Sequence, residues 1–282
     1  MTLLLPTKEE LDFLEANASA QVVCSADVDG WEERLKVYGP KLIAAMRDQR
    51  QRMNDCEGQT TANSDEAGQF YLTGKITQMS DIYAYNGSEM VDRGQVGANS
   101  GASIQSGVIL LTAGLTKHGI DPGLPTEQDW PYDSYESNTG RFLERAKGAA
   151  LKPSYIAQQG PPPEWDNLLP SLAAGGRLHI GIFWAPKFVQ MDKYFAWSRN
   201  AWSGGGHALC IITALFVNGQ WYLVVWNSHG NSFRLMPRKN YEEYLERGFD
   251  PFKAYLVMPD KPVERYYDRK VSGGGYLPFN VG

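Results

Sequence analysis

Two apolar runs late in the chain, Ala208–Val217 and Trp221–Trp226, are rich in β-branched and aromatic residues and predict two paired strands. Asn218-Gly219 separates them and favours a tight hairpin turn, because both turn positions accept a positive φ. A hairpin folded at this turn leaves Asn227 three residues out of register with His207. At about 3.3 Å per residue the offset is roughly 10 Å, which a bulge or strand twist can absorb. The pattern therefore predicts an imidazole and a carboxamide together at an open end of a sheet.

Other patterns predict helices in the first half of the chain and strands mainly in the second half. Asn54-Asp55 are good N-cap residues, and a helix is expected from Cys56 to Leu72, where Thr73-Gly74 stops it. Pro40 is expected in the first turn of another helix. Further helices are predicted over residues 41–51, 104–118, 166–174 and 241–247, and further strands over residues 178–184 and 254–258.

The small and proline-rich segments indicate where the chain divides. Gly160-Pro-Pro-Pro163 is typical of a hinge between two lobes. We therefore expect an N-terminal extension over residues 1–45 and a main domain over residues 46–260. The main domain would contain a helical lobe at 46–163 and a β lobe at 164–260, followed by an extended tail over residues 261–282.

Composition excludes several classes of partner. Hydrophobic residues make up 43% of the chain and charged residues 21%, as in an ordinary globular protein. The net charge of −5 gives no basic face, so we expect neither nucleic acid nor an anionic membrane as a partner. No run is apolar enough to span a membrane, and the first residues do not form a signal peptide, so a cytoplasmic or virion-associated protein is predicted.

The cysteines offer a candidate nucleophile. Cys24, Cys56 and Cys210 form neither an even disulfide framework nor a metal-ligand spacing, so no metal or other cofactor is expected. Cys210 lies in an apolar strand and is interpreted as a small buried hydrophobe. Cys56 is expected in the first helical turn, where the dipole and free N–H groups favour a thiolate. The alternative interpretation is a cysteine that merely begins a polar helix.

Together these residues resemble the papain family of cysteine peptidases over roughly residues 46–260. The family places histidine and asparagine about 130–150 residues after its cysteine, and Asn227-Ser-His-Gly230 is similar to the family's Asn-Ser-Trp-Gly. Further similar motifs follow in the family's order: Thr73-Gly74-Lys-Ile76, Met79-Ser80-Asp81, Asn99-Ser100-Gly101 and Trp130-Pro131-Tyr132.

The resemblance implies an α+β, two-lobed fold, with a helical first lobe, an antiparallel β-barrel-like second lobe and an active-site cleft between them. It implies that Cys56 is the nucleophile, that His207 is its ion-pair partner and general acid, and that Asn227 orients the ring. The oxyanion hole would use the Cys56 N–H and a glutamine side chain, for which Gln49 is favoured and Gln51 stays open. The residues implied for substrate binding are Asn99, Ser100, Gly101 and Gly206.

The chain departs from the family pattern around the nucleophile. Glu57 stands where the family has tryptophan and Asp55 lies on the other side, so two carboxylates are predicted to disfavour the thiolate and to raise the pKa of Cys56. Removing the Glu57 charge is expected to raise thiol reactivity at pH 6–7. His229 replaces the tryptophan that shields the Asn–His contact. Met53 and Ala98 occupy what look like the positions of the usual first-lobe disulfide.

Three functions are compatible with these features. The first is a papain-like thiol peptidase or amide hydrolase acting on a peptide or protein substrate. The second is a catalytically weak or inactive papain-like scaffold with a structural or assembly role, for example in a phage virion, with both termini contacting neighbouring chains. The third is a peptidoglycan-cutting Cys-His amidase, against which the Asn-Ser-x-Gly element argues. The sequence favours the first.

Overall fold

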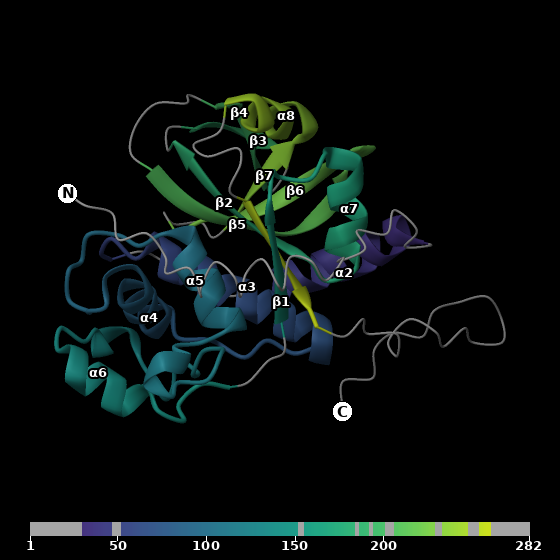
Figure 1. Ribbon diagram of the computed structural model, residues 1–282. Coiled ribbons are helices and arrows are strands. Elements are labelled where there is room, and N and C mark those ends of the chain that lie inside the picture. Colours follow the sequence, from purple (N-terminus) through teal and green to yellow (C-terminus); the bar gives the residue numbers. More distant parts are fainter. Residues whose placement is uncertain are drawn as a thin grey trace, which may run out of the picture.

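The protein is described by a computed structural model that covers residues 30–46, 52–151, 155–183, 186–191, 194–200, 206–228, 233–247 and 254–260. Helices from the first half of the chain form one lobe and a large sheet dominates the other (Figure 1). The helices are α2 (Trp31–Ala45), α3 (Cys56–Thr73), α4 (Asp81–Arg93), α5 (Ile104–Thr112), α6 (Thr139–Ala146), α7 (Trp165–Ala173) and α8 (Arg238–Arg247), with 3-10 turns at Thr116–His118 and Tyr132–Ser134.

The strands form one eight-stranded sheet in the order β1-β8-β2-β5-β6-β7-β4-β3. They are β1 (Tyr155–Gly160), β2 (Arg177–Phe183), β3 (Pro186–Met191), β4 (Tyr194–Asn200), β5 (Gly206–Val217), β6 (Gln220–Trp226), β7 (Phe233–Pro237) and β8 (Ala254–Pro259). The described pairings are antiparallel except for one parallel bridge between β4 and β7. The predicted α+β class, with helical and β lobes, is confirmed.

The predicted β5–β6 hairpin is confirmed, and its register explains how the strand ends meet. Asn218 and Gly219 form the turn with φ values of 50° and 80°, the backbone that this dipeptide favours. Ile212 is an extra residue between two paired positions of β5. This bulge shifts the ladder by one, so Cys210 pairs with Trp226, and Asn227 continues the strand two residues from the position opposite His207. The bulge thus removes one residue of the predicted offset.

Helix α3 runs between the sheet on one side and α4 and α5 on the other (Figure 1). Its bounds match the predicted helix, with Asp55 as N-cap and Gly74 as a left-handed C-cap. Most of its side chains are buried although many are polar, because the helix is covered on both sides. Gly58 allows close packing against α4, since a Cβ there would lie 2.5 Å from the carbonyl oxygen of Asp81. The central position of α3 brings its first residue to the junction of the two lobes.

Helix α2 belongs to the packed body of the protein. Leu35 and Leu42 are fully buried against the sheet, and a Cβ at Gly39 would lie 2.5 Å from a carbonyl oxygen of β5. Pro40 was predicted in a first helical turn but lies inside α2. Burial of the leucines on either side of it outweighs the poor helix propensity of an internal proline.

The helix predicted over residues 104–118 is too long. It ends at Thr112 because Gly114, with a φ of 68°, reverses the chain, and residues 116–118 form a separate 3-10 turn. Strand β1 lies before the predicted hinge, yet it pairs along its length with β8 of the sheet. The predicted division at residues 45, 163 and 260 stays a prediction, and residues 1–29 and 261–282 lie outside the described residues.

Candidate active site

Cys56 is the first residue of α3 and lies beside the start of β5. Asp55 precedes it as the N-cap, although its carboxylate does not cap the helix. The backbone N–H of Ala208 lies near the Cys56 thiol and acts to lower its pKa. Because Ala208 directly follows His207, the strand that carries the predicted imidazole lies beside the predicted thiol.

His207 and Asn227 meet at the end of the β5–β6 hairpin. The Nε2 atom of His207 lies 3.1 Å from the Oδ1 atom of Asn227, and the two residues are 5% and 2% exposed. An amide oxygen accepts a hydrogen bond, so this contact assigns the ring proton to Nε2 and leaves Nδ1 as the basic nitrogen of the neutral ring. The structure thus brings together the imidazole and carboxamide that the hairpin pattern predicts.

The environment of Cys56 raises the pKa of its thiol. Burial is the largest cause, and the charges of Glu57 and Asp55 add to it, while the Ala208 N–H opposes it. The predicted direction of the pKa shift is confirmed. The two carboxylates, which the sequence predicts as its cause, contribute less to it than burial does. The helix start alone therefore does not produce a thiolate here, and a proton acceptor such as His207 would have to stabilise one.

Glu57 points away from the solvent into the helical lobe. Its carboxyl is completely buried and accepts a hydrogen bond from the Thr61 hydroxyl at 2.5 Å. Burial raises the pKa of Glu57 to about 8, and the neighbouring hydroxyl groups of Ser88 and Thr61 offset only part of the shift. Glu57 is therefore uncharged at pH 6–7, which differs from the charged carboxylate that the sequence predicts next to the thiol.

Asp55 is fixed by side chains from both directions. Its Oδ2 atom accepts hydrogen bonds from the Tyr132 hydroxyl at 2.7 Å and from Gln59 Nε2 at 3.2 Å. Burial raises the pKa of Asp55, and these two hydrogen bonds lower it. The sequence singles out Trp130-Pro131-Tyr132 only as a motif, and the structure shows that its tyrosine anchors the residue before Cys56.

The predicted substrate-binding residues lie on an exposed loop and at a strand start. Asn99 and Ser100 are exposed in the loop between α4 and α5, and Gly101 is partly buried. Gly206 is an exposed residue at the start of β5, next to His207. Asn54 joins the loop to the start of α3 through two hydrogen bonds to Asn99, so part of the predicted set lies near the Cys56 segment.

The sequence did not predict the residue that anchors the loop between α4 and α5. Glu89 of α4 is fully buried, and its carboxylate accepts the N–H groups of Gly97 and Asn99. Nothing in the local pattern distinguishes Glu89 from an exposed helical glutamate. Gln49, Gln51 and His229 lie outside the described residues. The roles of the two glutamines as oxyanion donors, and of His229 in place of the family's tryptophan, therefore remain predictions.

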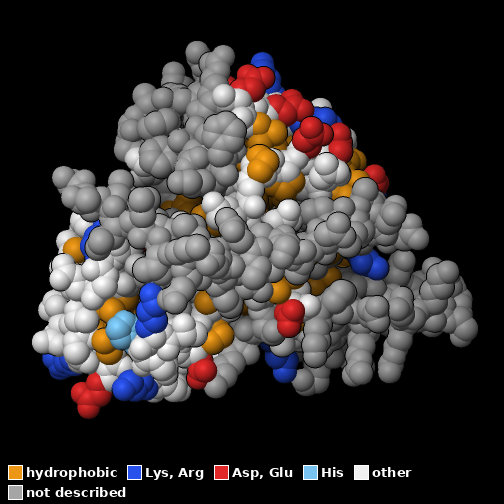
Figure 2. All heavy atoms as spheres, in the orientation of Figure 1, with side chains coloured by type: hydrophobic (Ala, Val, Ile, Leu, Met, Phe, Trp, Pro, Cys, Tyr) orange, Lys and Arg blue, Asp and Glu red, His pale blue; other side chains and the backbone are white. Residues whose placement is uncertain are grey.

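The described residues contain neither a metal centre nor a membrane-spanning helix. Within the described part of the chain, no group of three His, Cys, Asp or Glu residues could hold a metal ion. Within the same part, no helix is long and apolar enough to cross a lipid bilayer. Acidic and basic side chains gather at the upper right of the face shown in Figure 2. Arg238 of α8 pairs with Asp166 of α7 and with Glu242. The residues of these ion pairs lie far along the sequence from the helix that carries Cys56.

The arrangement of lobes and sheet is the fold of papain-like cysteine proteases, as comparison with solved structures shows. One similar structure is the proform of the Amb a 11 cysteine protease, a major ragweed pollen allergen, with a TM-score of 0.55 and 14% identity. That match covers 77% of this chain and 64% of the ragweed chain, so this chain spans less than two thirds of that protein. Another is xylellain, a cysteine protease from Xylella fastidiosa, with a TM-score of 0.50, 16% identity, and 77% of this chain and 84% of that chain covered. No family model matches the sequence, and no curated protein matches it.

Proposed function

We propose that the protein is a thiol peptidase that cleaves peptide bonds with Cys56, His207 and Asn227. The observation that carries the proposal is the contact of 3.1 Å between His207 Nε2 and Asn227 Oδ1, at a strand whose next residue, Ala208, lies near the Cys56 thiol. An imidazole oriented by a neutral amide, beside a thiol at a helix start, is the arrangement needed for nucleophilic catalysis by cysteine. The likeness in fold to cysteine proteases supports the same reaction class.

In this proposal the Cys56 proton passes to Nδ1 of His207, and the thiolate attacks the carbonyl carbon of the substrate. The tetrahedral intermediate collapses when His207 returns the proton to the leaving amine, which leaves an acyl group on the sulfur. Water then attacks this thioester with His207 as the base, and the acid product and the free thiol are released. Asn227 holds the ring so that Nδ1 faces the sulfur throughout.

The raised pKa of Cys56 sets the conditions under which the reaction runs. A thiol that is costly to ionise makes the imidazolium–thiolate pair less populated near neutral pH. We therefore expect peptidase activity to rise toward alkaline pH more than that of a cysteine peptidase whose thiolate is already formed at pH 5. Ionisation of Glu57 near pH 8 adds a negative charge beside the thiol and limits the gain above that pH.

The proposal is tested by hydrolysis of a fluorogenic peptide library by the wild type and by three variants. Cys56→Ala should abolish hydrolysis, His207→Ala should lower kcat by a factor of about 10³ or more, and Asn227→Ala should lower it less, because the catalytic pair remains. Asn167→Ala, an exposed asparagine on α7, serves as the matched control and should be as active as the wild type.

The result that would refute the peptidase is specific. The proposal is refuted if two results are obtained with folded wild-type protein. The protein hydrolyses no member of the library, and its Cys56 reacts with iodoacetamide no faster than N-acetylcysteine does. The protein would then be the inactive scaffold. Circular dichroism of every variant shows whether the fold is kept.

A further inference from the structure

The loop of residues 97–101 is held to α4 by a buried carboxylate. Glu89 Oε1 accepts the Asn99 N–H at 2.8 Å, and Glu89 Oε2 accepts the Gly97 N–H at 3.0 Å. The Tyr135 hydroxyl donates to the same carboxylate at 3.2 Å. Both halves of the loop are therefore tied to one fully buried side chain.

A second tie joins the loop to the segment that leads into the Cys56 helix. The Asn54 N–H donates to Asn99 Oδ1 at 3.2 Å, and the Asn54 Nδ2 donates to the Asn99 carbonyl oxygen at 2.8 Å. Asn99 has a φ of 44°, a left-handed backbone that asparagine tolerates and that turns its carbonyl and its side chain toward the same neighbour. Asn54 lies two residues before the thiol, so this pair links the loop directly to the nucleophile segment.

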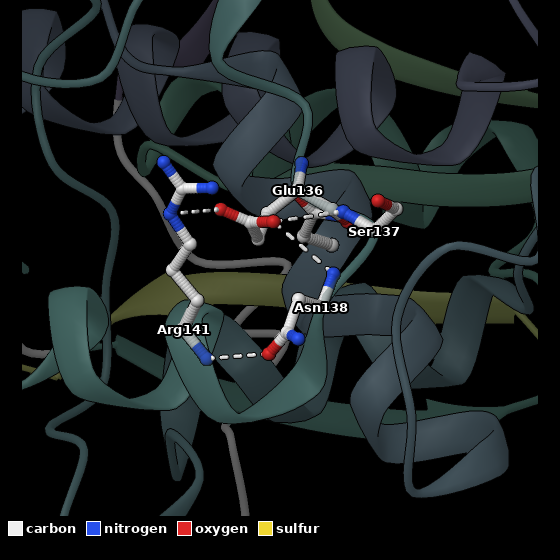
Figure 3. A network of polar contacts seen from close by, with 5 residues as sticks. Glu136, Ser137, Asn138 and Arg141 are labelled. Carbon is white, nitrogen blue, oxygen red and sulfur yellow. Dashed lines mark hydrogen bonds and ion pairs between the residues drawn. The ribbon is translucent and has the colours of Figure 1, made fainter.

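The back of the loop packs against a shelf formed by residues 136–141. A Cβ at Gly97 would lie 2.9 Å from the Ser137 carbonyl oxygen, so loop and shelf are in close contact. Figure 3 shows the shelf itself: Glu136 accepts the N–H groups of Ser137 and Asn138, both at 3.1 Å, and pairs with Arg141 at 3.3 Å. The loop is thus fixed on three sides and leaves its outer edge exposed.

We propose that Asn54 and Glu89 are positioning residues that hold this loop at a fixed place relative to the Cys56 sulfur and thereby determine how tightly a peptide binds beside it. The inference rests on the proposed peptidase function. An extended peptide is recognised by hydrogen bonds to a rigid backbone edge, and an edge that is ordered in advance avoids the entropy cost of ordering it on binding. Asn54 and Glu89 touch neither substrate nor sulfur in this account. They act through Asn99 and Gly97.

The test compares two reagents that alkylate Cys56. Iodoacetamide is small and needs no contact with the loop, whereas a dipeptidyl epoxide must lie along it. Each rate is divided by the rate of the same reagent with N-acetylcysteine, and the quotient of the two gives the peptide preference. Asn54→Ala should lower this preference about fivefold to thirtyfold through loss of two hydrogen bonds while the iodoacetamide rate stays unchanged. Asn167→Ala should match the wild type in both.

A double-mutant cycle separates the Asn54–Asn99 tie from a general loss of order. Asn99→Gly keeps the positive φ available and removes the acceptor side chain. If the two asparagines act through each other, the double variant should lose no more preference than the worse single variant. Glu89→Gln should lower the preference as well, because its amide group cannot accept the second N–H. Should that buried variant fail to fold, the two exposed asparagines still decide the matter.

The possible failures are distinguishable. A wild-type protein whose normalised preference is about one does not recognise peptides beside Cys56, and this result overturns both the proposed function and the inference. A wild-type preference that is high, and that Asn54→Ala leaves unchanged, overturns the inference alone. Additive losses in the double variant would show that the two asparagines act independently, which also contradicts it.

Discussion

Replacing Glu57 with glutamine should change how the stability of the protein depends on pH. Burial raises the pKa of this carboxyl from 4.5 to about 8. Between these two values the folded state binds one more proton than the unfolded state, so stability is lost as the pH rises, at about 1.4 kcal/mol per pH unit. The stability that Glu57 contributes is fully present below pH 4.5, and it is completely lost above about pH 8.

Glutamine keeps nearly the same shape, carries no charge and can still accept the Thr61 hydroxyl. The free energy of unfolding of Glu57→Gln, minus that of the wild type, should therefore increase by about 3 kcal/mol between pH 5 and pH 8. Taking this difference cancels the other titrating groups that the two proteins share.

The assay is urea unfolding at pH 5, 6, 7 and 8, followed by tryptophan fluorescence and extrapolated to zero urea. The control is Glu144→Gln, which replaces an exposed glutamate on α6. Its free energy of unfolding should differ from that of the wild type by less than about 0.5 kcal/mol at each pH. A Glu57→Gln difference that is constant from pH 5 to pH 8 would show that Glu57 is ionised in the folded protein. The description of a neutral carboxyl behind the thiol would then be wrong.

Two further predictions concern the cysteines. Iodoacetamide followed by peptide mass mapping should label Cys56 in the folded chain and spare Cys210, because Cys210 is fully buried and its pKa is raised to about 12; equal labelling of both would contradict this burial. Glu57→Gln should leave the Cys56 alkylation rate within about twofold of the wild type at pH 6–7, because the carboxyl is already uncharged there. A several-fold increase at pH 6 would instead support the charged carboxylate expected from the sequence.

Local signals in the sequence were sufficient where the structure depends on local chemistry. Asn218-Gly219 determines a turn because few other residues accept its two positive φ values. Asn54-Asp55 and Gly74 mark the ends of α3 because helix termini need specific caps. The same patterns predict that Cys56 begins a helix and that His207 and Asn227 lie at the open end of the hairpin.

Packing decided the features that the sequence alone left open or predicted differently. Asp55 is a good capping residue, yet its carboxylate turns to Tyr132 and Gln59 because these side chains reach it. The bulge at Ile212 alters the strand register, and no local pattern marks its position. Pro40 lies in mid-helix because its neighbours pack on the sheet.

The sequence by itself determined the hairpin and the start of the helix that carries Cys56, since each follows from backbone preference and hydrophobic pattern over a few residues. The fold class was implied by the resemblance of several motifs, in their order along the chain, to the papain family. Only the tertiary structure decided the charges and the fine positions around that cysteine. Burial, which depends on α4 and α5 covering α3, makes Glu57 neutral and raises the pKa of Cys56. The ties from Glu89 and Asn54 to Asn99 join residues 10 and 45 positions apart, and contacts of this kind exist only once the chain has folded.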